Sequence, residues 1–277
     1  MTMTMTNHTE RLPMNLLEGK RLLITGIVTT DSIAFATAEA ALRHGAELVF
    51  TAFDRDRERT VEAVAHLGTA LDVLELDVSD ASHFGRLTDE IKERWGRLDG
   101  ALHAVAFAPR SALAGDFLDA DAAGTMQAFQ TSTYSYAALA KVLAQLAPKT
   151  GGSIVGLDFD AAGAWPVYNW MGVCKAALES VNRYVARDLG PREIRSNLVA
   201  AGPIHTRAAG GIPDFQRLTS AWESRSPMIW DPYDPAPVAD AVCFLFSDMA
   251  RAITGEILHV DGGYHAMAAD VVRHEPS

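Results

Sequence analysis

The sequence predicts an α/β protein in which a parallel sheet is covered by helices on both faces. Short β-branched or leucine-rich runs alternate with amphipathic segments along the chain, and no linker, repeat or composition break divides its 277 residues. A hydrophobic content of 48% allows one large core. We therefore expect a single domain over residues 16–266, with flexible tails at 1–15 and 267–277.

Seven short apolar segments are predicted strands, enough for one sheet. They are Arg21–Thr25, Glu47–Phe53, Val73–Asp77, Gly100–Ala106, Gly152–Leu157, Ser196–Ala201 and Glu256–Val260.

Helical patterns lie between these strands. Asp80–Trp95, for example, places apolar residues at spacings of three and four, as a helix lying on a sheet does. The other predicted helices are Ser32–Arg43, Thr131–Leu146, Tyr168–Leu189 and Pro237–Phe246. The segment 203–235, rich in Gly, Pro and Arg, leaves the sixth strand at the edge where α/β sheets bind ligands. We expect it to form a short substrate-binding lid.

Charge and cysteine content exclude several function classes. The net charge of −11 argues against nonspecific binding to nucleic acid or to an anionic membrane. Cys174 and Cys243 lack metal or redox spacing and favour a reduced core. Neither a signal-peptide pattern nor an apolar run long enough to span a bilayer occurs, so we expect a cytoplasmic protein. His103 and His259 alternate within strands, and we expect no metal site.

Tyr168 and Lys175 are the first catalytic candidates. Seven positions apart on a helix, they lie within about 20° of one face. A phenol can hydrogen-bond a carbonyl as charge builds on its oxygen, and a nearby ammonium can anchor a cofactor ribose and lower the phenol's proton affinity. A solvated or core-edge helix is the alternative interpretation of the pair.

The turn after the first predicted strand is a candidate phosphate site. Gly26 and Ile27 precede Ser32 and Ile33 at a predicted helix start, where free backbone N–H groups favour a pyrophosphate. The turn lacks the full G-x-G-x-x-G pattern, and Ser32 alone is equally typical of a helix N-cap.

Residues at the ends of strands two to four extend this candidate nucleotide site. Asp54 can accept hydrogen bonds from an adenosine ribose, which favours NADH, although Arg55 and Arg57 are the residue type that holds a 2′-phosphate. Phe53 could stack on adenine or finish the sheet's packing. The remaining candidates are Asp77 and Val78, which could bind adenine or cap the next helix, and Val105 and Ala106, which let a cofactor pass closely.

The chain resembles the short-chain dehydrogenase/reductase superfamily and, within it, the bacterial enoyl-acyl-carrier-protein reductases, above all their mycobacterial branch. The motifs run from about Leu17 to Ala266. They are Gly26-x5-Ser32-Ile33-Ala34, Phe53-Asp54-Arg55, Leu76-Asp77-Val78, Gly152-Ser-Ile-Val-Gly-Leu-Asp-Phe159, Tyr168-x6-Lys175, Ala177-Leu-Glu-Ser-Val-Asn-Arg183, Arg195-Ser-Asn-Leu-Val-Ala-Ala-Gly-Pro-Ile204 and Val260-Asp-Gly-Gly263.

This resemblance implies a Rossmann-like doubly wound fold and the NADH-dependent reduction of the trans-2 double bond of enoyl thioesters carried on acyl carrier protein or CoA. Tyr168 would bind the thioester carbonyl, Lys175 the nicotinamide ribose, and Phe159 would help to form the acyl pocket. Ile204 and Thr206 would join the cofactor contacts. The family also implies a homotetramer, paired through the surfaces of the helices predicted at Thr131–Leu146 and Tyr168–Leu189.

Departures from the wider superfamily sharpen these expectations. The superfamily spaces its pair as Tyr-x3-Lys, and position 172 here is glycine, which separates enoyl reduction from ketone reduction. A ketone or alcohol oxidoreductase and a non-catalytic NADH-binding regulator remain the alternatives. The lid is shorter than the mycobacterial pattern, which favours shorter acyl chains. Arg207, Arg217 and Arg225 are candidates for a basic rim that receives an acidic carrier protein.

Overall fold

The computed structural model describes residues 15–68 and 72–271. The predicted tails therefore lie largely outside the described residues. Of the predicted C-terminal tail, residues 267–271 are described, and the backbone N–H groups of Met267 and Val271 donate to the carbonyls of Tyr264 (3.1 Å) and Ser224 (3.0 Å).

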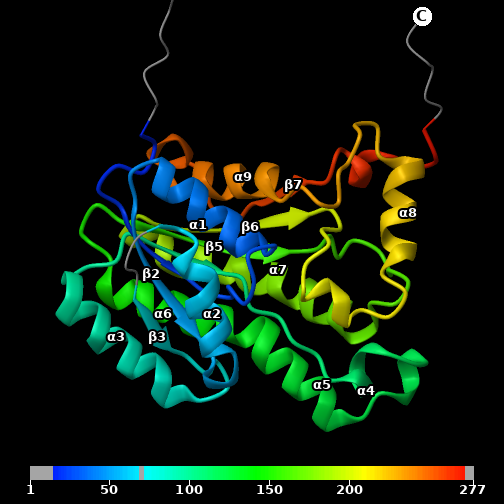
Figure 1. Cartoon of the computed structure of the whole chain (residues 1–277), viewed down its shortest axis with the longest axis horizontal. Coiled ribbons are helices and arrows are strands. Elements are labelled where there is room, and N and C mark those ends of the chain that lie inside the picture. The colour runs from blue at the N-terminus through cyan, green and yellow to red at the C-terminus, as the bar shows by residue number, and fades with distance from the viewer. Residues whose placement is uncertain (1–14, 69–71, 272–277) are drawn as a thin grey trace, which may run out of the picture.

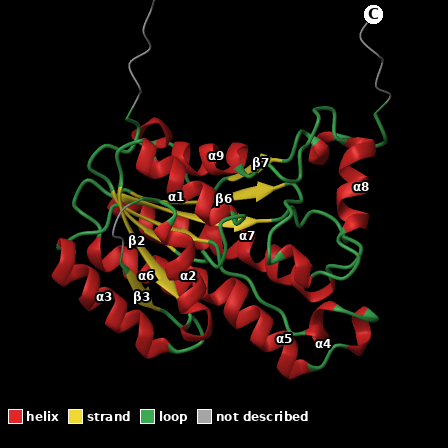
Figure 2. Cartoon of the chain, in the orientation of Figure 1, coloured by secondary structure: helices red, strands yellow, loops and turns green. Residues whose placement is uncertain are grey.

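A seven-stranded, wholly parallel sheet forms the centre of the fold, as predicted (Figure 2). Its order is β3-β2-β1-β4-β5-β6-β7, the arrangement of a doubly wound Rossmann-like fold. The strands are β1 (Arg21–Ile24), β2 (Glu47–Ala52), β3 (Val73–Glu75), β4 (Gly100–His103), β5 (Gly152–Asp158), β6 (Ile194–Ala201) and β7 (Ile257–Val260). All seven strands begin within two residues of their predicted starts, because each begins with the first apolar residues of its run.

Helices cover both faces of the sheet and divide the interior into two apolar cores (Figure 1). One core is closed by α1 (Ile33–Arg43), α2 (Arg57–Ala65) and α9 (Ala236–Phe246). The other is closed by α3 (Ala81–Trp95), α6 (Ser135–Leu146) and α7 (Asn169–Leu189). Ser32 and Asp80, predicted as the first residues of helices, are instead N-caps that accept from the N–H groups of Phe35 and Ser82.

Several helices of the structure are not predicted from the sequence. The helix predicted at Thr131–Leu146 is preceded by α5 (Ala122–Phe129) and by a π-helical turn at Gln130–Tyr134, so the helical run begins earlier than expected. α2, α4 (Arg110–Leu113) and α8 (Gln216–Arg225) also lie in segments for which no helix is predicted. Their apolar stripes are short: α2, for example, buries only Thr60, Ala63 and Val64.

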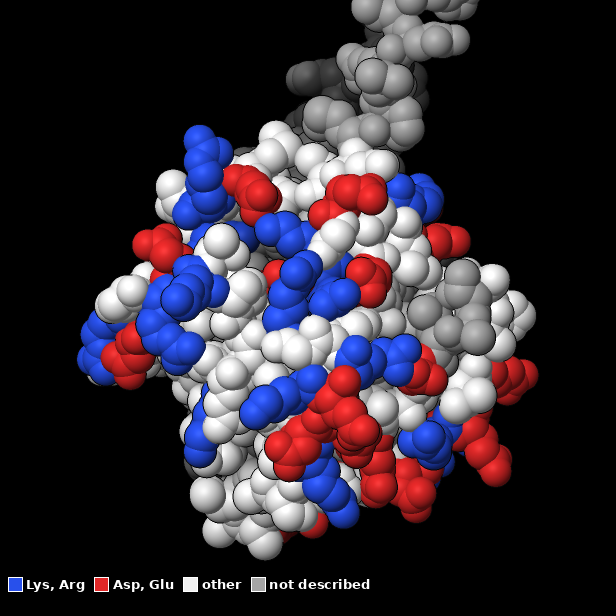
Figure 3. All heavy atoms as spheres, turned by 90° about the vertical axis from the view of Figure 1, so that its left-hand side faces the viewer, with Lys and Arg blue, Asp and Glu red and all other residues white. Residues whose placement is uncertain are grey.

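β6 points toward the segment 203–235, which contains α8, whereas β2 and β3, at the other end of the twisted sheet, point downward in the view (Figure 1). The face that lies on the left of Figure 1, away from α8, carries basic and acidic side chains interspersed (Figure 3). Within the described part of the chain, no helix is both long and apolar enough to cross a bilayer. The candidate site therefore lies at the edge near α8, where parallel sheets bind ligands.

Candidate active site

Tyr168 lies in a tight turn immediately before α7 rather than inside that helix. It is the N-cap residue, with φ −112°, and its carbonyl accepts from the N–H groups of Met171 (2.9 Å) and Gly172 (3.3 Å). The residues on either side have positive φ, 60° at Val167 and 37° at Asn169. A β-branched residue such as Val167 seldom adopts this conformation, and such backbone strain is concentrated at functional sites.

Residues at the end of β5 contact both Tyr168 and Lys175: Leu157 lies within the strand, and Phe159 follows its last residue. The Nζ of Lys175 donates to the carbonyl of Leu157 at 2.7 Å, and the ring of Phe159 lies 5.0 Å from the ring of Tyr168. Lys175 is only 6% exposed and Tyr168 only 8%. Tyr168 and Lys175 are therefore both buried at the end of β5. Tyr168 precedes α7, so the argument from helical periodicity does not apply to it.

Asp158 lies between Leu157 and Phe159, the residues that contact Lys175 and Tyr168, and it is not among the predicted site residues. It ends the apolar β5, is 5% exposed, and neither carboxyl oxygen has a hydrogen-bond partner among the described residues. Burial raises the pKa of Asp158 to about 7, and the positive charge of Lys175 opposes this rise. The signal available in the sequence was a carboxylate directly after a run of buried strand residues.

The phenol of Tyr168 is held in its protonated form. Burial, and then the charge of Asp158, raise the pKa of Tyr168 above its ordinary value, while burial lowers the pKa of Lys175. Burial is the largest effect on the pKa of Tyr168, and the expected lowering of the phenol's proton affinity by the Lys175 ammonium stays a prediction. A protonated, buried phenol is a hydrogen-bond donor suited to a carbonyl oxygen.

His103 adds a neutral imidazole close to Lys175. Its Nε2 lies 2.7 Å from the Oγ of Ser135, which follows the π-helical turn, and its ring meets Tyr136 edge-on at 5.5 Å. Burial, and then the charge of Lys175, lower the pKa of His103 to about 3. These contacts indicate that His103 is a core residue, which is the expected role.

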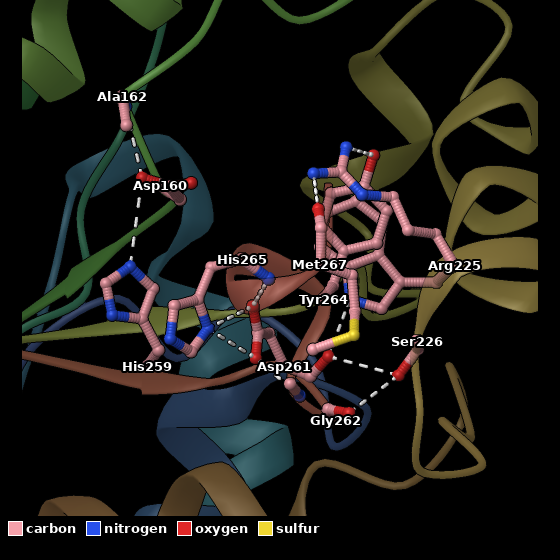
Figure 4. A network of polar contacts seen from close by, with 12 residues as sticks. Asp160, Ala162, Arg225, Ser226, His259, Asp261, Gly262, Tyr264, His265 and Met267 are labelled. Atoms are coloured by element: carbon pink, nitrogen blue, oxygen red, sulfur yellow. Dashed lines mark hydrogen bonds and ion pairs between the residues drawn. The ribbon is translucent and has the colours of Figure 1, made fainter. Parts of the chain in front are cut away.

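His259, the other histidine considered in the sequence analysis, lies in a polar cluster. His259 stacks on His265 at 3.9 Å, and the two rings face Asp160 and Asp261 respectively (Figure 4). Across residues 15–68 and 72–271, His, Cys, Asp and Glu side chains form no group of three or more that could hold a metal ion.

The turn after β1 fits a dinucleotide phosphate. Gly26 has φ 83°, and a Cβ at this position would lie 2.0 Å from the carbonyl oxygen of Ala104, so only glycine allows the close approach to β4. Thr60 donates to the carbonyl of Ile27 at 2.6 Å and fixes the turn. The side chain of Ile27 is buried in the core, so only its backbone can meet a ligand. Next to this turn, α1 directs the N–H groups after Ser32, including that of Ile33, toward the same edge.

The candidate adenosine end of the site carries an exposed aromatic and arginine cluster. The guanidinium of Arg55 lies 5.1 Å from the ring of Phe53 and 5.8 Å from the ring of Phe107. Phe53 is 38% exposed and so is not needed to finish the sheet's packing. Asp54, in the one-turn helix after β2, is exposed beside them. These planar groups can stack on an adenine base.

The remaining predicted cofactor residues lie at the same sheet edge. Asp77 accepts from the N–H and hydroxyl of Ser79, so it stabilises a turn, while Asp80 rather than Asp77 caps α3. Val105 and Ala106 follow β4 and are half-buried and exposed. After β6, Ile204 is buried and the hydroxyl of Thr206 accepts from the N–H of Ala209 at 3.2 Å.

The predicted basic rim is only partly formed. Arg207 and Arg217 are exposed in the segment 203–235. Arg225 is instead turned inward: its guanidinium lies 4.5 Å from the ring of Tyr264 and donates to the carbonyl of Met267. Arg225 is therefore part of the protein's packing in this structure and does not contribute to the rim.

Comparison with known proteins places the chain in a family. Residues 26–265 match the model of the family described as enoyl-(acyl carrier protein) reductase. The chain is 45% identical to the enoyl-[acyl-carrier-protein] reductase [NADH] of Mycolicibacterium smegmatis and 44% identical to that of Mycobacterium avium, in each case over 90% of this chain and 97% of the relative.

A more distant relative carries the same description. The Escherichia coli enoyl-[acyl-carrier-protein] reductase [NADH] FabI is 38% identical over 92% of this chain and 97% of its own length. The resemblance drawn from the motifs is confirmed, and the chain belongs to the enoyl-(acyl carrier protein) reductase family.

Proposed function

We propose that this protein uses NADH to reduce the trans-2 double bond of enoyl thioesters carried on acyl carrier protein, in fatty-acid synthesis. The observation that carries the proposal is a buried, protonated Tyr168 beside Lys175 at the carboxyl end of β5. The names of the relatives, which specify both NADH and the enoyl thioester reaction, support the same cofactor and substrate.

The chain's own residues would position and polarise the substrate. Tyr168 donates a hydrogen bond to the thioester oxygen as negative charge develops there. Lys175, which donates to the carbonyl of Leu157, would hold the ribose hydroxyls of the cofactor through its ammonium. Phe159 packs against the ring of Tyr168 and helps to exclude water from the acyl group. When bound, NADH supplies the hydride that the reduction requires.

The cofactor would lie along the carboxyl ends of the strands. We assign its pyrophosphate to the backbone of Gly26, Ile27, Ser32 and Ile33, and its adenosine to Phe53, Asp54, Asp77 and Val78. Val105, Ala106, Ile204, Thr206 and Lys175 complete the set toward the nicotinamide. The unpartnered oxygens of Asp158 next to Lys175 support this assignment, because a bound ligand would explain why they have no partner among the described residues.

The decisive experiment follows the loss of reduced-nicotinamide absorbance with NADH or NADPH and with crotonyl or acetoacetyl thioesters. We expect turnover of NADH with the crotonyl thioester only, and a loss of about 10²-fold in kcat for Tyr168→Phe without a change in thermal stability. Turnover of the acetoacetyl thioester would indicate a ketone reductase. NADH binding with no turnover would indicate a regulator, and a fully active Tyr168→Phe variant would refute the role of Tyr168.

The segment 203–235 would act as a lid over the acyl group, and its exposed Arg207 and Arg217 would meet the acidic carrier protein. The same assay tests this point when crotonyl-carrier protein is compared with crotonyl-CoA. We expect the KM for the carrier-protein substrate to rise more steeply with salt, since exposed charge pairs are screened. Equal salt dependence of the two substrates would contradict the proposal.

The protein would act as a homotetramer in the cytoplasm. An apolar groove of about 630 Å³ runs between α6 and α7, and we propose that a second copy of the chain covers it. The residues that line it include Ala137, Ala140, Ala144, Val181 and Val185. Small residues on two adjacent helices allow the close approach of two further helices.

The buried, unpaired Cys174 and Cys243 are in keeping with a reducing compartment.

A further inference from the structure

Five aromatic rings from three separate segments form a continuous cluster that begins at Tyr168. Phe159 contacts Tyr168 and Trp165, each at 5.0 Å between ring centroids. Trp165 then contacts Trp222 at 5.2 Å and Tyr264 at 5.4 Å. Trp165 therefore connects the rings at the catalytic wall to the rings near the C-terminus of the described chain.

Trp165 also lies between a packed apolar cluster and an open cleft. On one side it packs with the apolar side chains around Tyr168, which include Ala108, Phe159 and Ile212. On the other side it lines an open cleft of about 470 Å³ with a mixed lining: Pro166, Leu218 and Ala221 are apolar, whereas Asp160, Arg225 and His265 are polar or charged. Of the residues that pack around Tyr168, only Trp165 lines this cleft. The indole is thus the partition between them.

The partition is held firmly from both sides. The indole N–H of Trp165 donates to the carbonyl of Asp160, and that of Trp222 donates to the carbonyl of Asp261 at 3.0 Å. Tyr264 stacks on Trp222 at 3.9 Å and 12°.

Behind these rings, the guanidinium of Arg225 covers Tyr264 and hydrogen-bonds its hydroxyl at 3.3 Å, while Asp261 accepts from the N–H groups of Gly263 and His265 (Figure 4). Trp165 is therefore fixed by hydrogen-bonded and stacked neighbours, and displacing it would disturb their contacts as well.

We propose that Trp165 closes the far end of the acyl pocket, so that the enzyme selects short enoyl thioesters, and that the cleft behind it is an acyl channel which the indole blocks. This inference rests on the proposed function. The thioester carbonyl is fixed at Tyr168, and the apolar tail must lie among the apolar side chains beside it, of which Phe159 and Trp165 lead toward the cleft. Each further methylene of the acyl chain that is buried strengthens binding about fourfold. Methylenes beyond the indole of Trp165 cannot be buried and therefore add no affinity.

The test compares kcat/KM for crotonyl-, octenoyl- and dodecenoyl-CoA. We expect the wild type to prefer crotonyl- to dodecenoyl-CoA, and Trp165→Ala to raise the dodecenoyl-to-crotonyl ratio by about tenfold or more, since two or three newly buried methylenes suffice for this. Trp165→Phe, which keeps an aromatic wall, should retain the wild-type ratio. Trp95→Ala, a tryptophan on α3 outside the cluster, is the matched control and should also retain it.

A second substitution refills the opened space. Ala221→Phe narrows the cleft, so the double variant Trp165→Ala/Ala221→Phe should lose most of the gain, while Ala221→Phe alone should leave crotonyl turnover unchanged. Trp165→Leu is smaller than the indole but keeps apolar bulk. It should give a partial gain if the alanine variant does not fold.

Two results would overturn the inference while leaving the proposed function intact. One is a wild type that reduces dodecenoyl-CoA as well as crotonyl-CoA. The other is a folded Trp165→Ala or Trp165→Leu variant with an unchanged ratio. Inactivity of the wild type with every chain length would instead refute the proposed function.

Discussion

At the scale of single residues, Asp158 is the least ordinary group in the site. Its carboxyl is buried without a hydrogen-bond partner, next to the buried ammonium of Lys175, and no ion pair between the two within 4.0 Å is present. Desolvation outweighs the attraction, because burial raises the pKa of Asp158 to about 7 despite the nearby positive charge. Charge on Asp158 therefore opposes folding of the ligand-free protein.

This balance predicts the pH dependence of stability. An unfolded aspartate releases its proton near its ordinary pKa of 3.8, whereas folded Asp158 keeps it to about pH 7. Between these values the folded state binds more protons, so stability falls as pH rises, and the loss is complete above about pH 7. Asp158→Asn is neutral at every pH, and its melting temperature should exceed that of the wild type by a margin that widens from about pH 4 to pH 7.

Thermal unfolding of the ligand-free protein at pH 5 and pH 8 measures this margin. Asp89→Asn, on the exposed face of α3, is the matched control and should show a constant difference. A margin for Asp158→Asn that stays constant across this range would show that the carboxyl is solvated or paired in solution.

At the scale of elements, the strands were predictable and the entry into α7 was not. Runs such as Leu22–Ile24 are apolar and short, as buried strands are. The alternation of these strands with helices predicts a parallel sheet covered by helices. The turn around Tyr168 depends on positive φ at Val167 and Asn169, which no sequence pattern signals because non-glycine residues seldom adopt it.

The functional site likewise contains residues that could be predicted from the sequence and residues that could not. Gly26 and Ser32 could be singled out because a glycine turn and a helix cap after a strand have direct physical meaning. Lys175 could be singled out through its seven-residue spacing from Tyr168. Trp165 could not, because its importance comes from contacts with Trp222 and Tyr264, which lie far away along the chain.

Two glycines in contrasting surroundings provide a test at this scale. A Cβ at Gly172, in the first turn of α7, would meet only Cδ1 of Tyr168 at 3.6 Å, an ordinary contact. Gly172→Ala should therefore stabilise the protein by about 0.5–1 kcal/mol, because alanine reduces the entropy of the unfolded chain. At Gly156 in β5, a Cβ would lie 2.6 Å from Leu198 and 2.9 Å from Tyr136. Gly156→Ala should cost about 1–3 kcal/mol through overpacking.

Urea unfolding of the two variants measures both effects on one scale. A destabilised Gly172→Ala variant would show that the turn at Tyr168 needs more conformational freedom than the helix geometry indicates. A neutral Gly156→Ala variant would show that β5 and β6 can separate locally.

At the scale of the whole molecule, the fold gives the two faces of the sheet different roles. α1, α2 and α9 complete one apolar core, and α2 presents a mostly polar outer surface. On the other face, α6 and α7 leave the apolar groove described above. α7 therefore carries Lys175 on its buried side and a candidate subunit contact on its outer side, so that assembly and the catalytic wall depend on one helix.

The assembly can be tested through Tyr184, which lines the groove from α7 and is 58% exposed in the single chain. Exposed aromatic side chains at the centre of an apolar patch contribute strongly to binding when a partner covers them. If the protein forms the proposed homotetramer through this groove, Tyr184→Glu should convert it into a smaller species, because the substitution would bury a charge against an apolar surface. Light scattering coupled to size exclusion measures the mass. Val61→Glu, which alters an exposed side chain on α2 at the opposite face, is the matched control and should remain tetrameric. A tetrameric Tyr184→Glu variant would mean that copies of the chain meet elsewhere, and a monomeric wild type would exclude the assembly altogether.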